Sequence, residues 1–202
     1  VPDQQSWNQY YNNLSKYEAL PQNSDWDKKR FDHIVDFITT ESISSESSIL
    51  DVGCGNGGLL HSFLQRGFCK LTGIDPTPPA STDTKLRFIQ GSIDSLEINE
   101  YYDVVIVEQV LEHLVEMRDF MKSLSKMQKT SGLLYIGVPD AMNFLQCSDG
   151  PFQQFSVEHI NFFTLKLLKQ FLESIGYALI KYEHVQYEIS PNIKVSFILG
   201  LW

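Results

Sequence analysis

One glycine-rich run has the residue types of a ligand-binding turn. Residues 51–58 read Asp-Val-Gly-Cys-Gly-Asn-Gly-Gly, after a short apolar run and before a stretch with helical spacing of apolar residues. Gly53 and Gly55 have no Cβ and can take positive φ, so backbone can lie against a ligand there. The first turn of the following helix offers N–H groups that have no partner within the helix. The run therefore predicts a binding site for a small ligand.

The charge beside this run indicates which ligand. Gly53, Gly55 and Gly58 also satisfy the G-x-G-x-x-G spacing of dinucleotide sites, so spacing alone does not decide. Asp51 would repel a pyrophosphate and attract a cation. S-adenosylmethionine has no phosphate and carries an ammonium and a sulfonium, so Asp51 favours it over NAD. Asp75, at the end of the next apolar run, is the expected partner of ribose hydroxyls in either case.

Strand-like and helix-like patterns alternate along the rest of the chain. The expected strands are residues 49–52, 71–75, 86–89, 102–107, 133–138, 177–185 and 193–199. The expected helices are residues 59–65, 114–127 and 165–175. Such alternation predicts a mostly parallel sheet with helices on both faces. Only a turn joins the last two strands, so they must pair antiparallel. We therefore predict an α/β, Rossmann-like doubly wound, mostly parallel seven-stranded sheet with an antiparallel last strand.

Two further amphipathic helices are expected before the sheet, over residues 7–17 and 25–40. We predict an N-terminal helical lid over residues 1–45 and a cofactor-binding domain over residues 46–202. The aromatic residues Trp7, Tyr10, Tyr11 and Trp26 could cover a cofactor, where a ring facing a sulfonium would gain cation–π energy of about 1 kcal/mol. Core packing is the alternative for these rings. The sequence begins without Met, so we expect a piece of a longer polypeptide.

Composition excludes several classes of protein. The net charge of −9 argues against nucleic-acid partners, which are bound largely through Lys and Arg. The longest apolar run is shorter than the roughly 18 residues of a membrane span, and the first residues do not resemble a signal peptide. Three cysteines without CxxC spacing predict neither a disulfide framework nor a cysteine zinc site. We expect a cytoplasmic protein without membrane insertion and predict no metal site.

Several segments resemble class I S-adenosylmethionine-dependent methyltransferases, in the order typical of that family. Residues 49–60 resemble the first motif, and residues 73–76 (Gly-Ile-Asp-Pro) the acidic ribose-binding end of the second strand. Residues 91–96 are similar to the adenine-side loop, although the family often has Asp in place of Ser92. Residues 102–114 resemble the fourth-strand motif that borders the methionine half. The resemblance implies these cofactor-binding residues: Asp51, Gly53, Cys54, Gly55, Gly57, Asp75, Pro76, Ser92, Ile93, Glu108 and Gln109.

Two segments bear on the methyl acceptor. Residues 108–111 (Glu-Gln-Val-Leu) lack the Asn/Asp-Pro-Pro-aromatic run of enzymes that methylate base amino groups. Residues 158–164 (Glu-His-Ile-Asn-Phe-Phe-Thr) resemble an element of sugar C-methyltransferases and related small-molecule enzymes. This resemblance implies a small soluble acceptor, with a sugar as one candidate, and His159 with Glu158 as general base. O-methylation is equally open.

Alternatives to these roles also follow from the sequence. Glu158 and His159 could merely brace the helix that opens at Thr164, and His113 is expected to pack or cap. For the whole chain, one alternative is a non-catalytic methyltransferase-like domain that binds partners or regulates a larger assembly. The other is an NAD-dependent oxidoreductase.

Overall fold

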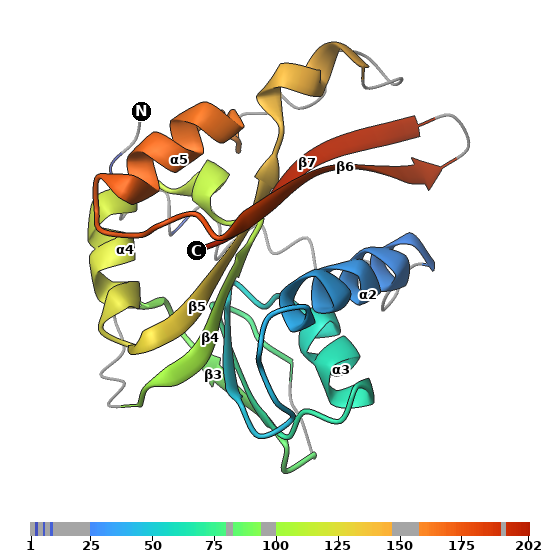
Figure 1. Ribbon diagram of the computed structural model, residues 1–202, viewed down its shortest axis with the longest axis vertical. Coiled ribbons are helices and arrows are strands. Elements are labelled where there is room, and N and C mark those ends of the chain that lie inside the picture. Colours follow the sequence, from blue (N-terminus) through green and yellow to red (C-terminus); the bar gives the residue numbers. More distant parts are fainter. Residues whose placement is uncertain are drawn as a thin grey trace. The chain divides into compact units, whose positions relative to one another are not determined.

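A computed structural model of the chain describes residues 3, 6, 9, 25–79, 83–93, 100–146, 158–190 and 193–202 (Figure 1). The chain divides into two compact units, one of residues 1–106 and 115–133 and the other of residues 107–114 and 134–202. Of the aromatic residues predicted to form a lid, Trp7, Tyr10 and Tyr11 lie outside the described residues. The predicted boundary at residue 45 stays a prediction. No helix in the described part of the chain is both long enough and apolar enough to cross a bilayer.

The sheet has seven strands in the order β3-β2-β1-β4-β5-β7-β6. Their bounds are β1 Ser48–Val52, β2 Lys70–Asp75, β3 Leu86–Gln90, β4 Tyr102–Glu108, β5 Gln128–Pro139, β6 Lys181–Ser190 and β7 Ile193–Leu201. Strand β1 pairs parallel with β2, and β2 pairs parallel with β3. Strand β7 pairs antiparallel with both β5 and β6. The predicted Rossmann-like fold class is thus confirmed, including the antiparallel strand.

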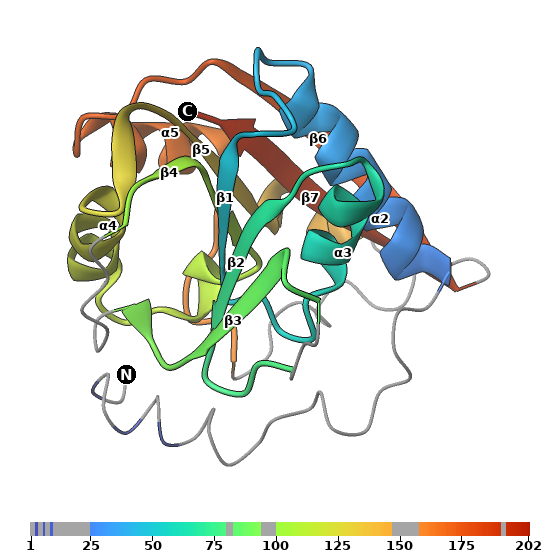
Figure 2. The same cartoon turned by 90° about the horizontal axis from the view of Figure 1, so that it is seen from below.

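In the first unit, apolar strands are covered by helices on both sides. Helices α2 (Asp25–Thr39) and α3 (Gly58–Gln65) pack against each other, and α3 packs on β2. Helix α4 (Met117–Ser125) lies on the opposite side of the strands (Figures 1 and 2). Strand β1 is buried at Ile49, Leu50 and Val52, as expected of a central parallel strand.

In the described part of the second unit, the paired strands β6 and β7 are accompanied by one helix and two short 3-10 turns. These are α5 (Leu165–Glu173), η3 (Leu111–His113) and η4 (Ala141–Gln146). Helix α5 begins as predicted, because the Thr164 side chain accepts a hydrogen bond from the Leu167 N–H. It ends before Gly176, whose φ of 98° suits the predicted C′ position.

The predicted starts of one helix and two strands were wrong, and the strand predicted to end at residue 185 continues to Ser190. The helix predicted from residue 114 begins at Met117, because Leu114 has extended backbone after the η3 turn. The strand predicted from residue 177 begins at Lys181, because the Tyr177 N–H donates to the Leu172 carbonyl and closes α5. Strand β5 begins earlier than predicted, within a polar stretch that carries no apolar signal.

Asp103 links three strands of the first unit and makes its stability sensitive to acid. One carboxylate oxygen accepts bonds of 2.8 Å from both the N–H and the hydroxyl of Ser48, and the other accepts from Lys129 Nζ at 2.7 Å. Burial raises the pKa of Asp103, but the combined bonds from Lys129 and Ser48 outweigh it and lower the pKa to about 2.

We expect Asp103→Asn to lower the free energy of unfolding by about 1 kcal/mol at pH 7, allowing for solvent screening of this partly exposed carboxylate. The folded pKa lies below the unfolded value of about 3.9. The stabilisation is therefore present above pH ~4 and is lost as pH falls toward 2. Urea unfolding of both proteins at several pH values checks this. A difference that stays constant from pH 6 to pH 3 would contradict it.

Candidate functional site

The glycine-rich turn after β1 has the backbone conformation that the sequence predicts. Gly53, Gly55 and Gly57 have φ of 80°, 51° and 76°, a region that other residues adopt only with strain. Gly57 is the N-cap of α3. The N–H groups of Gly53 and Cys54 donate to the Ile74 carbonyl of β2 at 2.8 and 3.1 Å. The turn is therefore held against the end of the neighbouring strand.

Asp75 joins the two loops that follow β1 and β2. It is only 7% exposed, and one carboxylate oxygen accepts from the Gly55 N–H at 2.9 Å. The other accepts from the Thr77 N–H, also at 2.9 Å. That second oxygen also accepts from the Thr77 hydroxyl at 3.4 Å, whereas the oxygen bonded to Gly55 has a second lone pair. Asp75 can therefore shape the turn and still accept hydrogen bonds from a ligand's hydroxyls.

The surroundings of Cys54 show that this turn is electronegative. Burial raises the pKa of the Cys54 thiol, and the carboxylates of Asp51 and Asp75 raise it further. Asp51 itself is only 3% exposed. The Cys54 side chain packs over Gly73, where an added Cβ would lie 2.6 Å from the sulfur. Cys54 is therefore a neutral packing group, and the two acids favour a cationic ligand over a pyrophosphate.

The predicted adenine-side residues lie beside the end of β2. The Gly91 N–H donates to the backbone carbonyl of Asp75 at 3.0 Å, and Gln90 Nε2 donates to the Pro76 carbonyl at 3.0 Å. Ser92 is half-buried and Ile93 is buried. The structure thus brings Asp75, Pro76 and the loop after β3 together within the first unit.

Glu108 and Gln109, predicted to border the methionine half, lie in the second unit where β4 ends. Glu108 Oε2 accepts from the Tyr135 hydroxyl at 2.9 Å, and Oε1 accepts from Gln109 Nε2 at 3.2 Å. Gln109 has φ of 54°, the only positive φ outside glycine in the described part of the chain. Strained backbone of this kind is concentrated at functional sites. The predicted contact of both residues with a cofactor stays a prediction.

The Glu108 carboxylate fills space that a side chain at position 137 would need. A Cβ added at Gly137 would overlap Glu108 Oε2 and lie 2.8 Å from the Tyr135 hydroxyl. We expect Gly137→Ala to displace Glu108 and weaken S-adenosylhomocysteine binding by about 10-fold or more, the value of one hydrogen bond to a charged group. Titration calorimetry measures this, with Glu108→Gln as the matched variant. If Gly137→Ala weakened binding and Glu108→Gln did not, the negative charge of Glu108 would have no role in it.

A third group of residues gathers around the η3 turn, although its members are far apart in the sequence. His113 Nδ1 lies 2.8 Å from the Glu158 carbonyl oxygen. The N–H groups of Ile160 and Asn161 donate to the Glu112 carbonyl at 2.9 and 3.0 Å. The Asn161 side-chain amide also donates to the carbonyls of residues 111 and 114. These bonds fix the segment that carries His159 onto the η3 turn.

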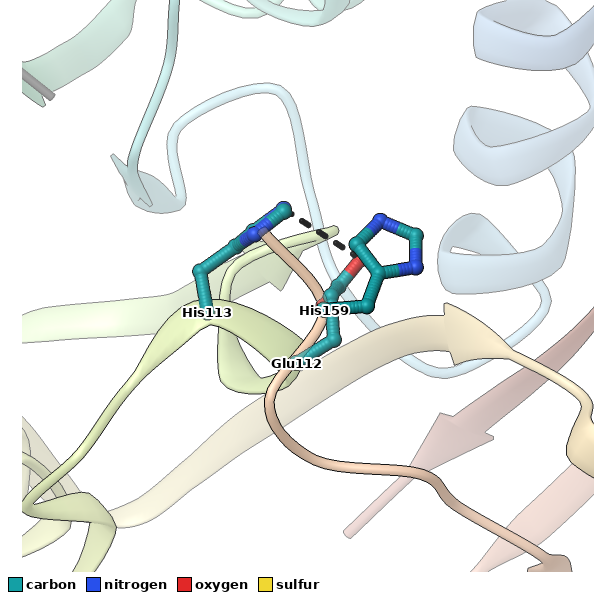
Figure 3. Close-up of side chains that lie close together, drawn as sticks. All are labelled: Glu112, His113 and His159. Atoms are coloured by element: carbon teal, nitrogen blue, oxygen red, sulfur yellow. Dashed lines mark ion pairs between the residues drawn. The ribbon is translucent and has the colours of Figure 1, made fainter. Parts of the chain in front are cut away.

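The side chains of Glu112, His113 and His159, here called the His-Glu cluster, point toward one another (Figure 3). Glu112 is 1% exposed, and its Oε1 lies 3.9 Å from His113 Nε2. The imidazole rings of His113 and His159 meet edge to face, with centroids 4.9 Å apart. One nitrogen or oxygen from each residue lies within 4.8 Å of the others. This cluster could move a proton or hold a divalent cation.

Sequence reasoning placed only part of the His-Glu cluster. His159 was predicted as a general base, whereas Glu112 was assigned no role and His113 only a structural one. The Glu158 carbonyl holds His113 at the η3 turn. The predicted bracing of the helix that opens at Thr164 by Glu158 and His159 stays a prediction. The sequence signal for this cluster was the adjacent pair Glu112 and His113. Only the tertiary hydrogen bonds show that His159 lies beside that pair.

A second pair, Asp140 and His184, was not foreseen. Asp140 is fully buried just after β5, and its Oδ2 lies 2.8 Å from His184 Nδ1 on β6. Asn143 Nδ2 donates to the same oxygen at 2.6 Å. Asp140 follows β5 and His184 lies on β6, far apart in the sequence, so no local pattern links them.

Comparison with known proteins gives the family. The profile of a family described as "Methyltransferase domain" matches residues 25–182. The mitochondrial ubiquinone biosynthesis O-methyltransferase of Schizosaccharomyces pombe is 31% identical over 119 residues, which are 53% of this chain and 43% of that protein. The ubiquinone biosynthesis O-methyltransferase of Rickettsia akari is 30% identical over 146 residues, 61% of this chain and 57% of that protein. The chain spans about half the length of these curated relatives.

Solved structures show the same fold. The 1,6-didemethyltoxoflavin-N1-methyltransferase of Burkholderia thailandensis, crystallised with 1,6-didemethyltoxoflavin and S-adenosylhomocysteine, superposes with a TM-score of 0.74. The match covers 100% of this chain and 90% of that one at 14% identity. At this identity the match speaks for the fold alone.

Proposed function

The chain belongs to the methyltransferase-domain family, and we propose that it transfers the methyl group of S-adenosylmethionine to a hydroxyl of a small molecule. Family membership confirms the predicted methyltransferase family. S-adenosylmethionine as the cosubstrate is part of the proposal. The residues that bind the cosubstrate, and the acceptor, are our proposals.

The observation that carries the proposal is the acidic glycine turn. Asp51 and Asp75 are both buried, and after burial itself their two carboxylates raise the pKa of the Cys54 thiol. A buried pair of acids favours a ligand that brings positive charge and hydroxyls. S-adenosylmethionine brings both, since its amino-acid half and sulfonium are cationic and its ribose carries two hydroxyls. We assign the ribose to Asp75 and the electrostatic attraction to Asp51.

Methyl transfer requires little covalent chemistry from the protein itself. The acceptor oxygen attacks the methyl carbon in line with the carbon–sulfur bond, the hydroxyl proton is lost, and the sulfonium leaves as the neutral thioether S-adenosylhomocysteine. Holding the two reactants in line supplies much of the rate enhancement. Removal of the hydroxyl proton is the remaining task, and we assign it to the His-Glu cluster, with His159 as the candidate proton acceptor.

Two observations bear on the acceptor. The relatives named O-methyltransferases support an oxygen as the methylated atom. The run at residues 158–164 supports a sugar as one candidate acceptor, since it resembles an element of sugar C-methyltransferases. A phenolic hydroxyl is the other candidate, because it ionises more readily than a sugar hydroxyl and would need less help from a base.

The test is transfer of isotopically labelled methyl from S-adenosylmethionine to a panel of phenols and saccharides, read by mass spectrometry of the products. We expect a methyl ether of one class and stoichiometric S-adenosylhomocysteine. A protein that bound S-adenosylhomocysteine but methylated no member of either class would instead support a non-catalytic binding domain.

A further inference from the structure

We propose that Asn56 is a modification site, which converts spontaneously to aspartate and isoaspartate. The conversion disrupts the glycine-rich turn, and a bound cosubstrate slows it. The modification and the disruption concern the turn alone. The protection by cosubstrate rests on the proposed function.

The sequence of the turn supplies both reacting groups. Asn56 is followed by Gly57, and no other asparagine in the sequence precedes a glycine. The backbone nitrogen that follows an asparagine lies close enough to the side-chain carbonyl carbon to close a five-membered ring with it. Gly57 has no side chain to shield this nitrogen, and its backbone is less restricted than that of other residues. Asn56 is half-buried, so water can reach it.

The reaction needs no reactant other than water. The Gly57 nitrogen gives up its proton and bonds to Asn56 Cγ, the bond from Cγ to Nδ2 breaks, and ammonia leaves with that proton. Water then opens the cyclic imide at one of its two carbonyl carbons. Opening at Cγ gives aspartate. Opening at the main-chain carbonyl carbon gives isoaspartate, in which the main chain runs through the side-chain carbons.

The hydrogen bonds of the folded turn act on both reacting groups. Asn56 Oδ1 accepts from the Gly58 N–H at 3.2 Å, which draws electrons away from Cγ, the atom that is attacked. Gly58 is the first residue of α3, so negative charge on Oδ1 meets the positive end of the helix. The Gly57 N–H, in contrast, donates to the Cys54 carbonyl at 2.8 Å. The Gly57 peptide must turn toward Cγ to react, so this bond must first open.

Ligand binding and modification therefore compete for the same turn. Gly55 and Gly57, on either side of Asn56, are among the residues to which we assign the cosubstrate. A ligand held by these residues opposes local opening of the turn. A reaction confined to the free protein slows in proportion to the fraction that is bound. S-adenosylhomocysteine at 100 times its Kd should therefore slow the reaction about 100-fold.

Isoaspartate would change the backbone at a position that the turn cannot spare. It inserts one extra carbon into the main chain directly before Gly57, the N-cap of α3. The insertion shifts Gly57 relative to Cys54, so the 2.8 Å bond between them is lost. We expect the isoaspartate protein to bind S-adenosylhomocysteine about 10-fold more weakly or worse, the equivalent of one or more lost hydrogen bonds.

The test is incubation of the chain at mildly alkaline pH, with and without saturating S-adenosylhomocysteine, followed by digestion and mass spectrometry. We expect the peptide that contains Asn56 to gain the mass of NH replaced by O. Asn143 and Asn161 are controls within the same digest, because each is followed by a bulky Phe, and both should stay unchanged. Titration calorimetry then compares the affinity of fresh and aged protein for S-adenosylhomocysteine.

Two variants separate the causes of the loss. Asn56→Gln would have to close a six-membered ring, so its affinity should stay constant during the incubation, whatever its starting value. Freshly prepared Asn56→Asp carries the charge of a product on a normal main chain. It should bind more tightly than the isoaspartate protein, and an equal loss in both would overturn the main-chain explanation.

The remaining outcomes distinguish the parts of the proposal. Conversion of Asn56 no faster than that of Asn143 and Asn161 would overturn the modification site. Unchanged affinity of the aged protein would overturn the disruption, and equal rates with and without bound ligand would overturn the protection. Fresh protein that bound no S-adenosylhomocysteine would contradict the proposed function and leave the modification site standing.

Discussion

Asp75→Asn should weaken binding of S-adenosylhomocysteine by about 100-fold or more. The Asp75 carboxylate accepts the backbone N–H groups of Gly55 and Thr77, one on each oxygen. An amide has a single oxygen, so one buried N–H would face an NH₂ group, at a cost of about 1–3 kcal/mol. Ribose hydroxyls would also lose a charged acceptor, and each 1.4 kcal/mol corresponds to a tenfold change in affinity.

Titration calorimetry with S-adenosylhomocysteine measures this effect. The matched control is Asp83→Asn, because Asp83 is exposed and accepts a similar bond from the Lys85 N–H ahead of β3. Asp83→Asn should bind as the wild type does. Equal affinities of Asp75→Asn and Asp83→Asn would show that Asp75 does not contact the nucleoside.

The second large effect concerns stability at the glycine turn. Gly57 has φ of 76°, and an added Cβ would lie 2.5 Å from Cζ of Phe88 on β3. Gly67 has φ of 90°, but an added Cβ would meet nothing within 4 Å. Gly67→Ala should therefore cost only the backbone strain, about 1–2 kcal/mol. Gly57→Ala should cost about 1–3 kcal/mol more, the usual penalty of overpacking.

Urea unfolding of both variants measures the difference, because the backbone strain is nearly common to both. If the two lost the same stability, the Phe88 ring would have moved aside at no cost. The contact between Phe88 of β3 and Gly57 would then contribute nothing to the shape of the glycine-rich turn.

The fold could be predicted from the sequence because its central strands are covered on both sides. Residues 49–52 and 71–75 are nearly continuous apolar runs, and the structure pairs them as β1 and β2. The polar start of β5 escaped prediction, since residues 128–132 form a strand without an apolar pattern. The η3 turn also escaped, because a 3-10 turn followed by extended Leu114 has the same apolar spacing as a helix start.

The glycine-rich turn of the first unit was easier to predict than the His-Glu cluster of the second unit. Asp51 and the glycines belong to one local turn after β1. Asp75 lies at the end of the adjacent strand β2. The His-Glu cluster instead joins residues 112–113 to residue 159 through bonds such as that from His113 to the Glu158 carbonyl. No periodic pattern marks such a contact, and for the same reason the pair of Asp140 and His184 could not be foreseen.

The most direct test of the cosubstrate assignment is the melting temperature of the chain with S-adenosylhomocysteine and, separately, with NADH. A ligand bound only by the native state at 100 times its Kd stabilises it by about 2.7 kcal/mol, a rise of roughly 5–10 °C for a chain of this size. We predict that rise with S-adenosylhomocysteine and no change with NADH. A rise with NADH alone would show that the acidic turn accepts a pyrophosphate after all, and would contradict the assignment.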